Sequence, residues 1–474
     1  MFFHTPEFLV LLLLNMVVFY MFPRSRLYVL ALGNAVFYGA TGVGYLALFI
    51  AVAAITFVCT LGIRGRHGIL LLTATIVLNV ANLVCFKYAM FMLTNVERLA
   101  GIELVEMETF FSKMILPVGI SFYTFQLIAY AVDVYKGKLE ATRSPIQFWV
   151  FISFFGQLVA GPIMRGKDFL PQIERLTNIR FSGSNMRIGA AYFCLGLVKK
   201  IVFADDIAEE VNVLFERSEQ LNGMEGWAAA YLFAFQIYFD FSAYSEMAVG
   251  IGYFFGMKLD INFRTPYISG SGTEFWRRWH ITLSSFIKDY IYIPLGGSRQ
   301  GRFRQYTNLF IAMTVSGLWH GAAWTFLAWG MFHGLLLVAH KIYSGALGAN
   351  RLDALREHML YRALTIIAFF HITCIGWVFF RADGIGNALG MVGRMLQIHP
   401  SQWNGSVALL FTVAAGLYIL HIAEYLFRKH AGRIGSLWHG LVPSPLRGLA
   451  YAGLIWLIIL FLRGEESSFI YFQF

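Results

Sequence analysis

Two histidines that could transfer protons lie in apolar parts of the sequence, forty residues apart. His280 lies in the stretch EFWRRWHITLSSFIKD (274–289), and His320 lies in SGLWHG (316–321). Imidazole titrates near pH 6.5, so its neutral form can accept a proton from a hydroxyl group at working pH. The residue type and the apolar setting therefore predict general acid–base chemistry at one or both histidines.

His320 has the more distinctive surroundings of the two. Gly317 and Gly321 have no side chain, so another chain segment or a substrate could approach its backbone closely. A lone histidine in a membrane span is also often only a hydrogen-bonding group between helices, and the residues alone leave this alternative open. His333 lies thirteen residues on in the same apolar run, more than three helical turns away, and we expect it to pack or hydrogen-bond.

Other histidines serve as comparisons for these two. His371 and His421 also lie in apolar runs, where packing or hydrogen bonding is expected. The triplet Trp-His-Gly recurs at 438–440 in a basic stretch that we interpret as a loop, and no chemistry is expected at His439.

The neighbours of His280 carry charge. Arg277, Arg278, Lys288 and Asp289 lie within nine residues of it, among tryptophans and aliphatic residues. One interpretation is an interfacial helix whose tryptophans lie in the aromatic belt and whose arginines extend to the membrane surface. The other is a cationic entrance for an anionic substrate, because arginine and lysine pair well with phosphate groups.

Motifs of other enzyme classes are missing from the sequence. It contains no H-E-x-x-H, G-x-S-x-G, P-loop or G-x-G-x-x-G pattern. The four cysteines are far apart and form no C-x-x-C pair, which predicts neither a metal site nor a disulfide framework.

The elements that position these residues are predicted to be membrane helices. Hydrophobic residues make up 58% of the 474 residues and charged residues only 14%, against roughly 25% charged in an ordinary soluble domain. Apolar windows close to the roughly 20 residues that span a bilayer recur from Phe8 to Leu462. The sequence thus predicts an all-α polytopic membrane protein with roughly ten or eleven transmembrane helices in a single domain, residues 1–474.

Loop charges predict the orientation of these helices. Basic residues dominate the loops at 24–26, 64–66, 136–143, 341–362 and 428–447, and acidic residues dominate those at 94–113 and 205–225. Basic loops are typically cytoplasmic, which places both termini outside the cytoplasm. The net charge of +10 follows from the same loops and requires no nucleic-acid partner.

Two apolar stretches have basic residues at both ends, namely 148–164 and 281–295. Since both flanks are then cytoplasmic, each stretch is expected to enter the membrane and return. Gly156, the Gly161–Pro162 pair and Pro294 suit such bends. Non-helical backbone at membrane depth must be shielded by protein or line a cavity.

The segments FWRRWHITLSSFIKDYIYIPLGG (275–297) and SGLWHG (316–321) together resemble the membrane-bound O-acyltransferase family, and the spacing from His280 to His320 fits its paired histidines. The likeness extends over nearly the whole chain, through PVGISFYTFQLIAYAVDVYKG (117–137), GPIMRGKDFLPQI (161–173), FDFSAYSEMAVG (239–250), NFRTPYIS (262–269), WVFFRAD (377–383) and FIYFQF (469–474). The set resembles the bacterial polysaccharide branch, whose members acetylate alginate, cellulose or peptidoglycan. Glu246 departs from that pattern, where aspartate would be expected.

The resemblance implies a fold and a set of roles. The fold would be a bowl of helices thinned at its centre, with an acyl-donor path from one side and an acceptor path from the other. His320 would be the catalytic histidine and His280 the second family histidine. The residues themselves place His280 toward the cytoplasmic donor entrance, because it follows Arg277 and Arg278 and precedes the stretch 281–295. His320 lies between glycines in an uncharged span and is expected to lie deeper. Arg277, Arg278 and Lys288 would bind the donor, and Ser316, Trp319 and Asp289 would support the site.

The resemblance also implies partners. The donor would be a cytoplasmic thioester, acetyl-CoA or an acyl carrier thioester, with no bound cofactor and no metal. The acceptor would be a polysaccharide, or a periplasmic acetyltransferase partner protein that completes the transfer, and membrane lipid would surround a multi-pass protein of the bacterial inner membrane. Two alternatives remain: a D-alanyl transferase of the teichoic-acid type, and a transporter or flippase.

Overall fold

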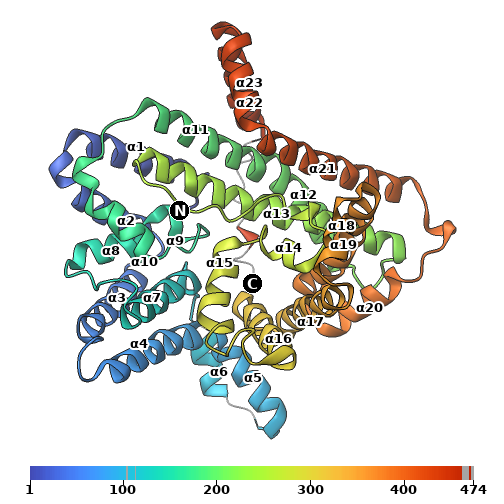
Figure 1. The fold of residues 1–474 in the computed structure, drawn as a ribbon, viewed down its shortest axis with the longest axis horizontal. Coiled ribbons are helices and arrows are strands. Elements are labelled where there is room, and N and C mark those ends of the chain that lie inside the picture. Colours follow the sequence, from blue (N-terminus) through green and yellow to red (C-terminus); the bar gives the residue numbers. More distant parts are fainter. Residues whose placement is uncertain (103–104, 113, 462–468, 471–474) are drawn as a thin grey trace. The chain divides into compact units, whose positions relative to one another are not determined.

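The computed structural model describes residues 1–102, 105–112, 114–461 and 469–470, and its regular elements within these ranges are all helices (Figure 1). This confirms the predicted all-α class. Helices suit an apolar environment because each satisfies its backbone hydrogen bonds within its own segment.

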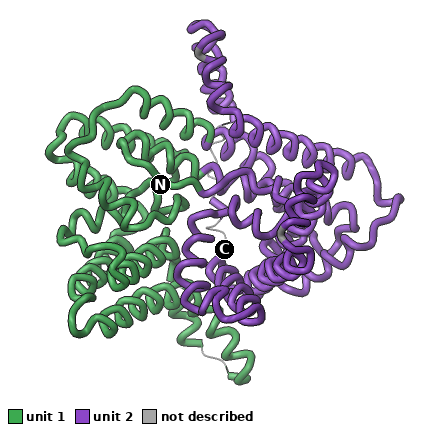
Figure 2. The backbone as a smooth tube through the Cα atoms, viewed as in Figure 1, with its two compact units in different colours: residues 1–195, 244–261 green, residues 196–243, 262–474 purple. Residues whose placement is uncertain are grey.

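The chain divides into two compact units, which Figure 2 shows in different colours. Unit 1 comprises residues 1–195 and 244–261, and unit 2 comprises residues 196–243 and 262–474. The single integral-membrane domain stays a prediction.

Unit 1 is built from short and long helices that pack in neighbouring pairs, such as α1 with α2 and α4 with α7. Its helices are α1 (Pro6–Met21), α2 (Arg26–Gly39), α3 (Val43–Gly62), α4 (Gly68–Leu83), α5 (Ala89–Ala100), α6 (Val105–Ser112), α7 (Ile120–Tyr135), α8 (Pro145–Ser153), α9 (Phe155–Leu158), α10 (Gly166–Glu174), most of α11 (Gly183–Val198) and the end of α13 (Gly223–Phe254).

The apolar stretch 148–164 does not form one long helix. Helix α8 has 9 residues and α9 only 4, and a break at Phe154 separates them. A 9-residue helix is about 14 Å long, too short to cross a bilayer core. The chain then turns into α10, which packs against α8. This arrangement is what a segment that enters the membrane and returns would require.

Unit 2 carries both predicted catalytic histidines. Its helices are α12 (Asp205–Glu216), most of α13, α14 (Gly272–Trp276), α15 (Ile281–Ile287), α16 (Gly301–His320), α17 (Trp324–Leu347), α18 (Ala349–Glu357), α19 (Met359–Arg381), α20 (Ile385–Met395), α21 (Gly405–Lys429), α22 (Ala431–Leu441) and α23 (Ser444–Phe461).

Helices α16 and α17 form a tight hairpin (Figure 1). A Cβ atom placed on Gly317 would lie 2.7 Å from the Cα atom of Gly330, and one placed on Gly321 would collide with the Phe326 ring. The two backbones can approach this closely because glycine has no side chain. The glycines around His320 were expected to admit another chain segment or a substrate. In the structure the segment beside them is α17.

Within the described residues, six helices are long and apolar enough to cross a membrane, or seven if the bent pair α1 and α2 counts as one span. This supports a multi-pass membrane protein. The count is lower than the ten or eleven expected because interrupted or polar helices do not meet the criterion. Helix α7, for example, has only 16 residues.

Candidate active site

His280 lies at the junction between α14 and α15. It is the residue that precedes α15, and its backbone has φ 41° and ψ 57°, in the left-handed region. Its side chain is fully buried. The imidazole ring lies 4.7 Å from the Phe241 ring of α13 and 5.9 Å from the Trp319 ring of α16.

His320 is the last residue of α16. The helix ends here because Gly321 adopts an extended conformation and the chain reverses into α17. The side chain is 3% exposed, and its ring lies 4.9 Å from the rings of both Trp319 and Trp329 and 5.3 Å from that of Phe380.

Trp319 brings the two histidines into one cluster. Its ring contacts His280 on one side and His320 on the other. Tryptophans from three other segments extend the cluster: Trp329 lies 5.8 Å from Trp377, which lies 4.8 Å from Trp279. Residues forty positions apart thus meet through the junction between α14 and α15 and through α16, α17 and α19. We call Trp279, His280, Trp319, His320, Trp329, His333 and Trp377 the histidine cluster.

Both histidines are buried, and the expected difference in membrane depth between them stays a prediction. His280 is 0% exposed and His320 3% exposed. Phe241 and Phe263 cover the His280 ring.

His333 packs among aromatic rings, as expected. It nevertheless belongs to the cluster, because it does not lie on one continuous span with His320. The chain reverses at Gly321, so His320 and His333 contact the same Trp329 ring, at 4.9 Å and 4.8 Å. The apolar run gave no signal of this reversal other than its glycines.

His371 and His421 were expected to pack or hydrogen-bond, and His421 Nε2 accepts the Tyr267 backbone N–H at 3.2 Å.

The His371 ring also bonds locally, because its Nδ1 lies 2.8 Å from the Ile367 carbonyl oxygen one turn earlier in α19. The second Trp-His-Gly triplet, expected in a loop, lies instead in the helix α22. Glycines within and beside that triplet did not prevent a helix there.

The other predicted site residues fall into two groups. Ser316 and Trp319 are buried, and Ser316 precedes His320 by one helical turn. Arg277 and Lys288 are exposed at either end of the segment that holds His280. Arg278 already has partners within the protein, since its guanidinium lies 3.0 Å from Glu274 and donates to the Arg264 carbonyl. Asp289 is half-buried, in the π-helical turn after α15.

The histidine cluster offers hydrogen-bond donors. Among the described residues, the indole N–H groups of Trp279, Trp329 and Trp377 and both ring nitrogens of His333 have no hydrogen-bond partner. Buried polar groups are nearly always paired in native proteins. Each of these N–H groups could donate a hydrogen bond to an acceptor oxygen. Within the described part of the chain no His, Cys, Asp and Glu residues group as metal ligands.

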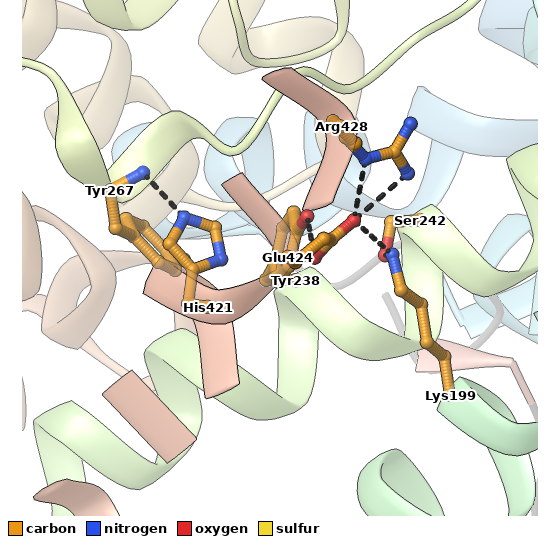
Figure 3. Close-up of polar contacts among 7 residues, drawn as sticks. All are labelled: Lys199, Tyr238, Ser242, Tyr267, His421, Glu424 and Arg428. Atoms are coloured by element: carbon orange, nitrogen blue, oxygen red, sulfur yellow. Dashed lines mark hydrogen bonds and ion pairs between the residues drawn. The ribbon is translucent and has the colours of Figure 1, made fainter. Parts of the chain in front are cut away.

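Sequence reasoning missed a second polar region in unit 2, which Figure 3 shows. Glu424 of α21 lies 2.7 Å from Lys199 Nζ and 2.8 Å from Arg428, and it accepts the Tyr238 hydroxyl at 2.8 Å. Side chains of Lys199 and Glu424 are only 5% and 12% exposed. Ser242 Oγ also accepts from Lys199, at 3.4 Å.

A second ion-pair group is adjacent in sequence. Lys200 Nζ lies 2.8 Å from Asp205 and 2.9 Å from Asp240, and Asp240 accepts the Ile470 backbone N–H at 2.7 Å. We call Lys199, Lys200, Asp205, Asp240, Glu424 and Arg428 the ionic network. Its three cations and three anions balance. Ionisable residues inside the apolar segments of α13 and α21 were the available signal.

The bond from the Ile470 backbone N–H to Asp240 holds the start of the C-terminal FIYFQF motif beside the ionic network. Phe469 lies 5.7 Å from the Phe241 ring, which in turn contacts His280. Residues 471–474 of the motif lie outside the described residues, as do Glu465 and Glu466.

Residues 66–380 match the model of the membrane-bound O-acyltransferase family. The chain is 37% identical over 384 residues to the probable alginate O-acetylase AlgI of Azotobacter vinelandii, covering 80% of this chain and 74% of that protein. It is 36% identical over 405 residues to the peptidoglycan O-acetyltransferase of Helicobacter pylori, covering 79% and 74%. It is also 27% identical over 281 residues to the teichoic acid D-alanyltransferase of Streptococcus thermophilus, covering 56% and 68%.

Both segments that carry the paired histidines lie inside the matched range, together with Trp329 and Trp377 of the histidine cluster. The fold, the apolar spans and the sequence matches agree. The chain is an acyltransferase that belongs to the membrane-bound O-acyltransferase family.

Proposed function

We propose that this protein moves an acetyl group from a cytoplasmic thioester to, or towards, a polysaccharide outside the cytoplasm, and that His320 is its general base. The observation that carries the proposal is the histidine cluster, in which Trp319 contacts both family histidines in a buried aromatic setting. Relatives named as alginate O-acetylase and peptidoglycan O-acetyltransferase support acetyl as the group and a glycan as the acceptor.

The proposed reaction needs one base and little else, because a thioester is already activated. The neutral imidazole of His320 takes the proton of an acceptor hydroxyl, whose oxygen attacks the thioester carbonyl carbon. The tetrahedral intermediate collapses, the carbon–sulfur bond breaks, and the leaving thiolate takes the proton from the imidazolium. The carbonyl end of α16 favours a positive charge at its last residue, which is His320.

The aromatic walls serve the same reaction. Trp319, Trp329 and Phe380 surround the His320 ring and exclude water, so the thioester is protected from hydrolysis while the acceptor is aligned. His280 would orient the donor beside Trp319 rather than take the proton. Exposed Arg277 and Lys288 are available to the phosphates of acetyl-CoA or to the phosphopantetheine of a carrier protein.

The orientation in the membrane is part of the proposal. With basic loops inside, Arg302 would be cytoplasmic, and the exposed residues Glu106 and Glu219 would lie outside. Single cysteines at these positions in intact cells test this. We expect an impermeant maleimide to label positions 106 and 219 but not 302, whereas labelling only at 302 would place the donor site on the wrong face.

The donor and the acceptor are tested with the wild-type protein in membrane vesicles. Acetyl-CoA labelled in the acetyl group is supplied on the cytoplasmic face, together with the polysaccharide-synthesis machinery of the host. We expect ester-linked label on the polymer or on a periplasmic acetyltransferase partner. Label that appears only when a carrier-bound D-alanine replaces acetyl-CoA would assign the protein to the alternative represented by the D-alanyltransferase relative.

A further inference from the structure

The backbone at His280 adopts a conformation that must be held in place. His280 and Thr265 are the two non-glycine residues with positive φ among the described residues, at 41° and 44°. Side chains disfavour this left-handed region, and residues remain in it only where the surrounding structure fixes them. Strain of this kind is found most often at functional sites, and His280 is one of the paired histidines.

The segment Asn262–Arg264 fixes the chain on both sides of His280. Before it, the Arg264 backbone N–H donates to the Arg278 carbonyl at 2.9 Å. After it, the Ile281 backbone N–H donates to the Asn262 carbonyl at 3.0 Å. His280 therefore lies in the middle of a short stretch whose two ends are bonded to the same three residues.

The Asn262 side chain completes this clamp. Its Oδ1 accepts the Thr282 hydroxyl at 2.7 Å and the Thr282 backbone N–H at 3.3 Å. A backbone N–H can only donate, so the atom that faces it must be the amide oxygen. Asn262 thereby binds the first turn of α15, immediately after His280, with its backbone and its side chain together.

The fold gives little other reason for an asparagine at this position. Asn262 is 0% exposed, and its Nδ2 group has no acceptor among the described residues. A buried donor without an acceptor is unfavourable, so the Nδ2 group adds nothing to stability. Its two Oδ1 contacts, both to the residue that follows the strained site by two positions, are what the amide contributes.

We propose that Asn262 is a positioning residue for the acyl transfer, acting through Thr282 to hold His280 in the left-handed conformation. Without the clamp, the backbone at His280 relaxes to an ordinary helical or extended conformation. The imidazole ring then leaves its place between Phe241 and Trp319. The proposal rests on the proposed function, because it assigns His280 a role in thioester chemistry.

The test uses the full-length protein in lipid nanodiscs, with thioester cleavage measured against acetyl-CoA concentration. We expect Asn262→Leu to lower turnover by about 10- to 100-fold, the effect of a misplaced reacting group. Thr282→Val removes only the 2.7 Å hydroxyl contact and should give a smaller loss. Thr282→Ser keeps the hydroxyl and should restore turnover. Thr282→Val also provides the test if Asn262→Leu does not accumulate.

Two comparisons separate positioning from general stability. Asn404 makes the same type of bond, accepting the Val407 backbone N–H at 2.9 Å at the start of α21, so Asn404→Leu should keep wild-type turnover. In a His280→Ala background, Asn262→Leu should cause no further loss, because the residue it positions is gone. Wild-type turnover in Asn262→Leu, or a further loss in the double variant, would overturn the proposal.

Failure of the proposed function has a different signature. If the wild-type protein itself does not cleave acetyl-CoA, the proposed donor is wrong. If the wild-type protein is active and the Asn262 and Thr282 variants match it, the donor stands and the positioning role is wrong.

Discussion

Unit 2 places polar side chains inside apolar surroundings in two different ways. The histidine cluster is aromatic: rings of Trp319, Trp329 and Phe380 contact His320, and its buried N–H groups include donors with no partner among the described residues. In the ionic network, every cation lies within 2.9 Å of a carboxylate. The first region therefore holds buried donors that lack a partner among the described residues, whereas the charges of the second region are paired.

This difference predicts opposite consequences of mutation. A buried ion pair contributes little over an apolar pair, but removing one partner is costly because the other charge stays buried. A buried histidine at neutral pH leaves no charge behind when it is removed. We therefore expect variants of the ionic network to accumulate less folded protein. Variants of the histidine cluster should accumulate normally and have a lower turnover.

The largest effect on stability is expected at Glu424, the carboxylate shared by Lys199, Arg428 and Tyr238. Glu424→Leu removes the carboxylate that pairs with both cations and should destabilise the protein by about 3–5 kcal/mol. Thermal unfolding in detergent and membrane yield measure this. Lys199→Met leaves Glu424 paired with Arg428 and should lower the stability by less. Equal stability of Glu424→Leu and wild type would remove the distinction between the two regions.

An intermediate effect is expected at His280. His280 and His320 are both buried, and both rings contact Trp319. We expect His280→Ala to lower turnover at saturating donor by less than about 10²-fold, the lower end of the range for a general base. The melting temperature should stay near that of wild type. A change in donor KM alone, with full turnover, would instead support the entrance role.

The smallest effect is expected at His439. The triplet that contains it lies in α22, and no residue of α22 belongs to the histidine cluster or the ionic network. His439→Ala should leave polymer acetylation and protein level unchanged. A clear loss of acetylation in this variant would mean that the Trp-His-Gly triplet itself, rather than its place in the fold, determines function.

The sequence predicted the parts of the site that depend on residue type. Apolar windows gave the helical membrane class. The stretch 148–164, which has basic residues at both ends, forms the short helices α8 and α9 and not one long span. The paired histidines and Trp319 were found from their segments. Each of these depends on local composition, which a single sequence contains.

The parts that were missed depend on where the chain turns. His333 joined the cluster because α16 and α17 reverse at Gly321, within a run that reads as one continuous span. Glu424 pairs with Lys199, which is 225 residues away in the sequence. Asn262 lies in the motif NFRTPYIS, and nothing local predicts that it bonds the turn after His280. Long-range pairing of this kind is set by packing.

The most direct test of the central claim is the turnover of His320→Ala at saturating acetyl-CoA, measured on purified protein with a melting temperature near that of wild type. If His320 is the general base, acetyl transfer should fall by about 10²–10⁴-fold while the donor KM changes little. Wild-type turnover in a folded His320→Ala variant would contradict the assignment and leave the histidine cluster as a packing feature of α16 and α17.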